Sequence, residues 1–244
     1  MNHQLAQATR IGDRRSNQDR ALVRQRDDCS LLVVADGLGG HAGGELAAEA
    51  LVRHLAAAFA EAELPAADPA GLLLELLGDG HRRILEAGEA QNPPICPLTT
   101  VVAALVQGDT LHWAHAGDSR LYRVSHPDVD LHTVDHTFAM ELYQRGLIDA
   151  AALAVHPTRN RLSRCLGGTQ SDPAIDLGGP LQLNAGDTLL LCSDGFWNGI
   201  NDDDLVDVLS RADLEAVLED LVEQAEHATR PYSDNVTAVA LRLG

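Results

Sequence analysis

The stretch L31-L-V-V-A-D-G-L-G-G-H-A-G-G44 decides the fold class, because it joins a strand pattern to the start of a helix. Residues 31–35 are Leu, Val and Ala, which is the composition of a buried strand, and the turn dipeptide Asp36-Gly37 ends it. Beyond the glycines, apolar side chains recur on one helical face at Leu46, Ala50, Leu51, Leu55 and Phe59. A strand and a helix therefore follow each other closely at this point in the chain.

The same two patterns extend along the rest of the sequence. Strand-like runs are predicted at 20–26, 30–35, 99–106, 110–116, 120–124, 188–193 and 235–242. Further helices are predicted near 70–87 and 214–222, and breaks at 62–71, 88–97 and 167–180. Because strands and helices are grouped without strict βαβ alternation, the sequence predicts an α+β layered fold.

The composition excludes several classes of protein. The 244 residues are 45% hydrophobic, which suffices for a sizeable core. Acidic residues outnumber basic ones 36 to 18, and the net charge of −18 repels nucleic acid and anionic membranes. No lysine occurs in the sequence, which excludes a Walker A loop, the ATP lysine of protein kinases and a Schiff-base lysine.

Neither a membrane segment nor a cysteine framework is indicated. The longest uncharged apolar stretch, 98–106, is far shorter than the roughly 20 residues that cross a bilayer, and the N-terminus lacks an apolar signal core. We therefore expect a soluble, cytoplasmic protein. The four cysteines are widely separated, so we expect buried small side chains instead of a zinc site or disulfides.

Carboxylates recur at the ends of apolar runs. Asp36, Asp118 and Asp194 each follow such a run and precede a small residue, and Asp234 stands just before the run 235–242. Each alone is typical of a turn. Together, four strand-end carboxylates predict an oxygen-only cage suited to Mg²⁺ or Mn²⁺.

Two other segments allow more than one interpretation. Arg14 and Arg15, beside Asn17 and Asp19, can bring a guanidinium to a phosphate or can form an exposed, salt-bridged turn. The glycine-rich segment 36–44 resembles a phosphate-binding loop but lacks the lysine and the GxGxxG spacing. Its alternative use is a tight backbone path past a metal, with Gly37 offering its carbonyl.

Taken in order, a set of short motifs resembles the metal-dependent protein phosphatases of type 2C. The motifs are R14-R-S-N-Q-D19, D36-G-L-G-G-H41, T99-T100, G117-D-S-R120, D135-H136, G167, S193-D-G195 and S233-D-N235, and the resemblance runs from about residue 8 to 242. It implies a central β-sandwich of two antiparallel sheets flanked by helices on both sides, in αββα layers. Because the implied site uses both termini, the resemblance also implies a single catalytic domain over 1–244, with a flap subdomain at about 135–170.

The resemblance implies a set of metal ligands. Asp36 would bridge two ions, Gly37 would contribute its carbonyl, and Asp194 and Asp234 would complete the set. Asp118 matches the aspartate that helps to hold a third ion in bacterial-type members. Asp19 and Asn235 would not bind the ions directly. They would act through coordinated water or by holding the direct ligands in position.

The resemblance also implies groups that handle the phosphate. Arg14 matches the phosphate-binding arginine by its spacing to Asn17, although the short turn after Gly12 leaves Arg15 as the alternative. His41 is the candidate proton donor to the leaving oxygen, with a water on the third ion as an equal contender. His112 and His115 are three apart in a predicted strand, so they point to opposite faces and are interpreted as structural.

The implied activity is hydrolysis of phosphoserine and phosphothreonine in proteins by direct attack of a water shared between two Mn²⁺ or Mg²⁺ ions. The expected partners are phosphorylated substrates of a serine/threonine kinase in bacterial signal transduction, and the expected state is a monomer. Arg159, Arg161 and Arg164 make the flap locally basic, which suits such a substrate or simply forms a solvated turn. Two alternatives are a catalytically inactive binding module and a phosphatase of nucleotides or sugar phosphates.

Overall fold

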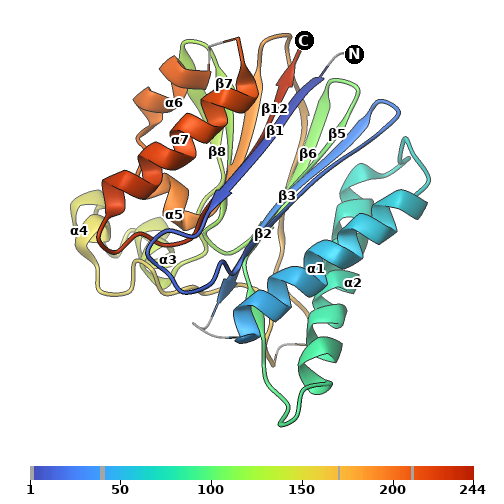
Figure 1. Ribbon diagram of the computed structural model, residues 1–244, viewed down its shortest axis with the longest axis vertical. Coiled ribbons are helices and arrows are strands. Elements are labelled where there is room, and N and C mark those ends of the chain that lie inside the picture. The colour runs from blue at the N-terminus through green and yellow to red at the C-terminus, as the bar shows by residue number, and fades with distance from the viewer. Residues whose placement is uncertain (1–2, 39–41, 170, 210–211) are drawn as a thin grey trace.

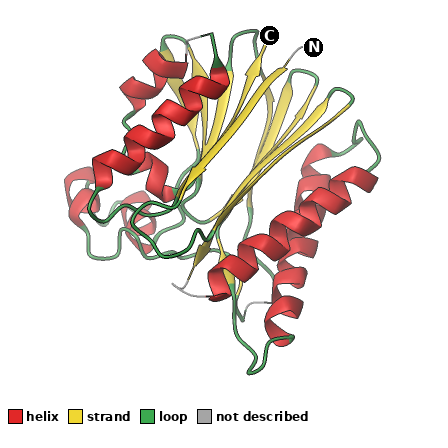
Figure 2. Ribbon diagram, in the orientation of Figure 1, coloured by secondary structure: helices red, strands yellow, loops and turns green. Residues whose placement is uncertain are grey.

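The computed structural model describes residues 3–38, 42–169, 171–209 and 212–244. Two antiparallel sheets pack face to face and helices cover both outer faces (Figure 1), so the predicted α+β sandwich is confirmed. Figure 2 shows the four layers in the order helix, sheet, sheet, helix. The two chain ends lie side by side at one end of the sandwich, where β1 pairs with β12.

One sheet has five strands in the order β1-β12-β11-β7-β8. Their bounds are β1 His3–Arg10, β12 Val236–Leu243, β11 Thr188–Cys192, β7 Arg120–Ser125 and β8 Asp128–His132. The second sheet has the order β10-β6-β5-β3-β4-β9, with β2 paired to β3. Its bounds are β10 Asp176–Gln182, β6 Thr110–Ala116, β5 Val101–Gln107, β3 Cys29–Leu38, β4 Leu98–Thr99, β9 Leu166–Gly167 and β2 Asp19–Arg26.

The helices form two outer layers and one end group. The second sheet is covered by α1 (Ala42–Glu61) and α2 (Pro69–Glu89). The first sheet is covered by α5 (Asp194–Trp197), α6 (Asp202–Leu209) and α7 (Leu214–Thr229). Two short helices, α3 (Phe138–Gln144) and α4 (Ala150–Val155), lie near α5 at the end of the sandwich opposite the chain termini.

Strand β3 is apolar at successive positions because it is covered on both of its faces. Leu31 and Val33 pack in the core beneath α1 and α2, whereas Leu32 and Val34 pack in the core between the sheets. Side chains of a strand alternate between its two faces, so a strand covered on both sides must be apolar at every position. This rigid, doubly covered strand carries Asp36 at its end.

The strand predictions failed where the sequence is polar or rich in glycine. The structure adds β1, β8, β9 and β10, and β10 begins inside the break that was predicted at 167–180. Strand β10 is an edge strand with no buried residue and contains G178-G-P180, which is typical of a loop. The prediction of buried cysteines is confirmed for Cys29 and Cys192 and is wrong for Cys96, which is exposed, while Cys165 is half-buried. Within the described residues, no helix has both the length and the apolar character needed to cross a membrane.

Candidate metal and phosphate site

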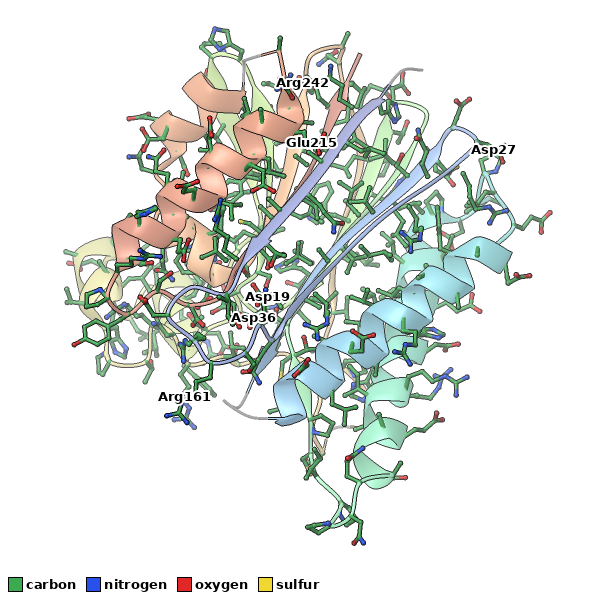
Figure 3. The ribbon with its side chains drawn as sticks, in the orientation of Figure 1. Asp19, Asp27, Asp36, Arg161, Glu215 and Arg242 are labelled. Carbon is green, nitrogen blue, oxygen red and sulfur yellow. The ribbon has the colours of Figure 1, made fainter. Side chains whose placement is uncertain are left out.

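Five aspartates from different segments gather at the end of the sandwich opposite the chain termini, and we call them the carboxylate cluster. Its members are Asp19, Asp36, Asp118, Asp194 and Asp234. Asp19 and Asp36 are paired across β2 and β3, and Figure 3 shows them side by side. Asp194 opens α5 directly after β11, Asp234 precedes β12, and Asp118 follows β6. Strand ends thus place all five on rigid supports; the sequence predicts this for four of them, and the structure adds Asp19 at the start of β2.

Backbone hydrogen bonds fix the relative positions of the Asp36 and Asp118 segments. The Thr100 amide donates to the Asp36 carbonyl at 2.8 Å, and the Thr100 hydroxyl accepts from the Asp36 amide at 3.0 Å. The same hydroxyl lies 2.7 Å from the Ser119 hydroxyl, and both side chains are buried. Thr100 therefore connects the two segments through a single buried side chain.

Asn235 joins the N-terminal loop to the C-terminal strand. Its carboxamide oxygen accepts from the Gln18 amide at 2.8 Å, and its nitrogen donates to the carbonyls of Ile11 and Ser16 at 2.8 and 3.0 Å. The loop passes so close to the Asp234 carbonyl that a side chain at Gly12 would overlap it, and the φ of +63° there also favours glycine. Asn235 thus supports the cluster by holding the loop in place.

Burial and mutual repulsion raise the pKa values of these carboxyl groups. The pKa of Asp36 lies well above its ordinary value, because the group is buried among the other four members. For the same two reasons the pKa of Asp194 rises to about 8. Burial, with the charge of Asp135, raises the pKa of Asp118 to about 7, and burial raises that of Asp19 to about 6. The protein alone does not compensate this concentration of negative charge.

The donor set fits divalent cations. Asp19 Oδ1 and Asp194 Oδ1 are buried and have no hydrogen-bond partner, although the other oxygen of Asp19 accepts from the Ser193 hydroxyl at 2.8 Å. Among the described residues, the only ion pair of the cluster joins Arg14 to Asp234, at 2.6 Å. Buried unpaired carboxylate oxygens are costly, and hard divalent ions bind such oxygens preferentially. The cluster therefore has the ligand chemistry of an Mg²⁺ or Mn²⁺ site.

A cleft of about 500 Å³ opens beside the cluster. It is lined by Asp13, Arg14, Arg15, Ser16, Gln18, Asp36, Gly37, Leu38, Asp194, Asp234 and Asn235. Both candidate arginines border this cleft, and Arg14 is the one that contacts a member of the cluster. His41, the predicted proton donor, lies outside the described residues.

Two residues that carried no predicted role surround Asp118. Trp197 Nε1 donates to the Asp118 carbonyl at 2.9 Å. Asp135 receives two hydrogen bonds from Arg120, at 2.7 and 2.8 Å, and the Arg120 guanidinium lies 3.7 Å from the centre of the Trp197 ring. Both residues lie in or beside quoted motifs, but only the folded chain shows that they meet at Asp118.

A second group of side chains that can bind metals, His115, His136 and Asp176, forms what we call the histidine cluster. The two imidazoles stack with centroids 4.4 Å apart. His136 Nδ1 accepts from the Gly117 amide at 3.2 Å, so Nε2 carries the proton and donates to Asp176 at 3.0 Å. Arg164 pairs with the same carboxylate. A metal needs a lone pair at His136 Nε2, which this arrangement does not offer, so the cluster is interpreted as structural.

Known proteins that resemble this chain in sequence are protein phosphatases. The family model described as Protein phosphatase 2C matches residues 6–235. The serine/threonine protein phosphatase PstP of Mycobacterium tuberculosis is 32% identical over 245 residues, covering 96% of this chain but 46% of PstP, so the chain spans about half the length of that relative.

Solved structures of serine/threonine phosphatases superpose on nearly the whole chain. A serine/threonine phosphatase of S. agalactiae superposes with a TM-score of 0.89 at 29% identity, covering 100% of both chains. The catalytic domain of a serine threonine protein phosphatase PstP in complex with two manganese ions superposes with a TM-score of 0.80 at 27% identity, covering 98% of this chain and 97% of that one. Because the family model matches residues 6–235 of the 244 in this chain, the chain belongs to the protein phosphatase 2C family.

Proposed function

We propose that the chain is a Mn²⁺- or Mg²⁺-dependent phosphatase that hydrolyses phosphoserine and phosphothreonine in proteins. The observation that carries the proposal is the carboxylate cluster, which has buried, unpartnered oxygens and borders a cleft that also contains Arg14. The relatives named as serine/threonine phosphatases and the solved structure with two manganese ions support it.

Each site residue then has a role that its surroundings support. Asp36, Asp194 and Asp234 would hold two divalent ions, and Gly37, which lines the cleft, would contribute its carbonyl as a further ligand. Asp118 would contribute to a third ion. Asp19 would act through water, because its one satisfied oxygen is held by Ser193.

The reaction needs a very large stabilisation of the transition state, because phosphate monoesters hydrolyse extremely slowly in water. When bound, the divalent ions supply the charge that activates water and neutralises phosphate oxygens. Arg14 supplies a fixed cation in the cleft that binds the non-bridging oxygens and orients the phosphorus, while its contact with Asp234 keeps it in place. The Thr100 and Asn235 hydrogen bonds hold the carboxylates still, so that little reorganisation accompanies the reaction.

The surroundings of the site suit a protein substrate. We take residues 135–170 as a flap subdomain of a single catalytic domain and use "the flap" below for its described residues, 135–169. It carries four arginines against three acidic residues, in a chain whose net charge is −18. This local charge favours phosphorylated partners, which we place in the cytoplasm as products of a serine/threonine kinase, with the phosphatase acting as a monomer.

The test is a metal-dependent assay on three substrate classes: phosphoserine and phosphothreonine peptides, p-nitrophenyl phosphate, and a panel of nucleotides and sugar phosphates. We expect Mn²⁺ to support turnover of the first two classes and a chelator to abolish it reversibly. Full activity of the chelated, metal-stripped protein would contradict metal dependence. Turnover restricted to the metabolite panel would contradict the substrate class, and no turnover of any substrate would indicate a binding module.

A further inference from the structure

The helix α4 is made entirely of apolar residues and yet buries none of them. Its sequence is A150-A-A-L-A-V155, and Val155 in it is 77% exposed. The neighbouring α3 buries only Ala139, and its Phe138 and Tyr143 are 40% and 42% exposed. The flap thus presents apolar side chains to solvent, and such surfaces on soluble proteins commonly mark binding sites.

Part of this apolar surface is hollowed into a pocket of about 270 Å³ between the flap and α5. It is lined by Arg120, Asp135, Thr137, Met140, Leu153, Ala154, Arg159, Asn160, Trp197 and Asn198. Small-molecule sites usually measure roughly 300–1,000 Å³, so this pocket suits a single side chain better than a whole metabolite. Met140, Leu153 and the Trp197 ring are partly exposed and supply the apolar contacts.

The pocket lies directly beside the carboxylate cluster. Trp197 is three residues after Asp194 in α5, so the two lie on one face of the helix, about one turn apart. The Trp197 indole also donates to the carbonyl of Asp118. An extended peptide advances about 3.3 Å per residue, so a side chain within three residues of a phosphoresidue at the cluster can reach the pocket.

The charges around the pocket favour a phosphoprotein as the source of that side chain. Arg159 lines the pocket, and Arg161 lies over Phe138 with its guanidinium 4.7 Å from the ring centre. In the part of the chain that the structure describes, neither arginine has an ion-pair partner. A second copy of this chain is a poorer occupant, because two molecules with a net charge of −18 repel each other.

We propose that this pocket binds an apolar side chain, of the size of leucine or methionine, that lies within three residues of the phosphoserine or phosphothreonine of the substrate. The inference rests on the proposed phosphatase function and adds a sequence preference to it. The pocket lies outside the cleft that holds the phosphate, so a small aryl phosphate does not use it.

The experiment is a peptide scan with the Mn²⁺-loaded full chain. Phosphoserine peptides carry one leucine at each position from −3 to +3 in an otherwise Gly/Ser/Glu sequence, and kcat/KM is compared with that of the leucine-free peptide. We expect leucine at one position to raise kcat/KM roughly 10-fold, in line with burial of one large apolar side chain. No preference at any position in the wild-type protein would overturn the proposal.

Two variants of α4 locate the effect. Leu153→Asp places a charge in the pocket and should abolish the leucine preference, whereas Val155→Asp, on the same helix but outside the pocket lining, should keep it. Both should hydrolyse p-nitrophenyl phosphate at the wild-type rate, because α4 has no fully buried residue and neither side chain lines the cleft beside the carboxylate cluster. Survival of the preference in Leu153→Asp, or its loss in both variants, would contradict the pocket assignment.

Two further controls keep the result interpretable. If Leu153→Asp also loses p-nitrophenyl phosphate hydrolysis, Met140→Ala, which alters the pocket from α3, replaces it and must reduce the preference. Sedimentation analysis that finds a dimer dispersed by Leu153→Asp would identify a second copy as the occupant and overturn the proposal. Hydrolysis of p-nitrophenyl phosphate and all peptides without preference refutes the pocket alone, whereas no hydrolysis of either refutes the phosphatase function itself.

Discussion

The carboxylate cluster and the histidine cluster both gather residues that commonly bind metals, but they differ in how their potential ligand atoms are hydrogen-bonded. In the histidine cluster, His136 uses both ring nitrogens in hydrogen bonds, and Arg164 neutralises Asp176. His115 Nε2 contacts the Val134 carbonyl, and its Nδ1 is buried without a partner. In the carboxylate cluster, buried oxygens of Asp19 and Asp194 have no partner. A set of metal-binding residue types is therefore weak evidence, and the hydrogen-bond state of each ligand atom decides whether it is available to an ion.

The pKa values of the carboxylate cluster and of the histidine cluster are shifted in opposite directions. Burial and neighbouring carboxylates raise the pKa of Asp194 to about 8, so the site as it stands favours the protonated acid over an unpaired anion. Burial, with the neighbouring His115, lowers the pKa of His136 to about 4, so its imidazole is neutral and hydrogen-bonded at neutral pH. The first region needs cations to be fully charged, whereas the second combines a neutral imidazole with a carboxylate that is already paired with Arg164.

Substitutions in the carboxylate cluster and in the histidine cluster should differ most in their effect on the catalytic rate. Asp194→Asn removes a charge from the proposed metal site, and we expect kcat to fall by at least about 100-fold. Asp176→Asn, the matched change in the histidine cluster, should leave kcat within a few-fold, because its carboxylate contacts only structural partners. The measurement is steady-state hydrolysis of a phosphoserine peptide at saturating Mn²⁺. Equal losses in the two variants would show that the histidine cluster takes part in catalysis.

In each cluster an arginine pairs with an aspartate, Arg14 with Asp234 and Arg164 with Asp176. Removing these two arginines should give the second-largest difference between the clusters. Arg14→Ala should lower kcat/KM roughly 10- to 150-fold, because a charge-assisted contact to phosphate is worth about 1.5–3 kcal/mol. Arg164→Ala, which loses an ion pair with a half-exposed Asp176, should change kcat/KM little. Arg15→Ala is the control for register in the N-terminal motif. A larger loss in Arg15→Ala than in Arg14→Ala, with metal binding intact in both, would assign the phosphate contact to Arg15.

The smallest effect is on stability, where the two clusters should respond to pH in opposite directions. In metal-free protein, Asp118 and Asp194 hold protons that the unfolded chain releases near pH 4, so stability should fall as the pH rises from about 4 to about 8. His136 contributes stability that is complete above its unfolded pKa of roughly 6.5 and is lost as the pH falls towards 4.

Thermal melts between pH 4.5 and 8.5 separate the two contributions. Asp194→Asn should flatten the decline on the alkaline side, and added Mn²⁺ should remove it in the wild-type protein. His136→Gln, which keeps an acceptor for the Gly117 amide, should flatten the loss on the acid side. A melting temperature in metal-free wild-type protein that rises steadily up to pH 8 would contradict the raised carboxyl pKa values.

The sequence predicts the carboxylate cluster better than it predicts the residues around it. Asp36, Asp118 and Asp194 each follow a strand pattern, and strand ends meet at the edge of a sheet, so local signals are sufficient. The hydrogen bond between His136 and Asp176 joins residues 40 positions apart through an edge strand whose Gly-Gly-Pro sequence resembles a loop. No local pattern encodes that contact.

The fold, too, was predicted only where the local sequence carries a clear strand pattern. The apolar strands β3, β5, β11 and β12 were predicted close to their observed bounds, because burial on both faces leaves a continuous apolar run. Strand β8 alternates exposed and partly exposed residues and pairs only with β7, so its sequence carries little strand signal. The pocket beside Trp197 was also not predicted, because its walls come from the flap and from α5.

The most direct test of the difference between the clusters is calorimetric titration of the metal-free protein with Mn²⁺ at pH 7, in two buffers that differ in ionisation enthalpy. We predict at least two bound ions and a net release of protons, because binding must displace the protons held by Asp194 and its neighbours. We further expect Asp194→Asn to lower the number or affinity of bound ions, whereas His136→Gln and Asp176→Asn should not. Loss of Mn²⁺ binding in His136→Gln or Asp176→Asn, with wild-type binding in Asp194→Asn, would contradict the assignment of the metal site to the carboxylate cluster.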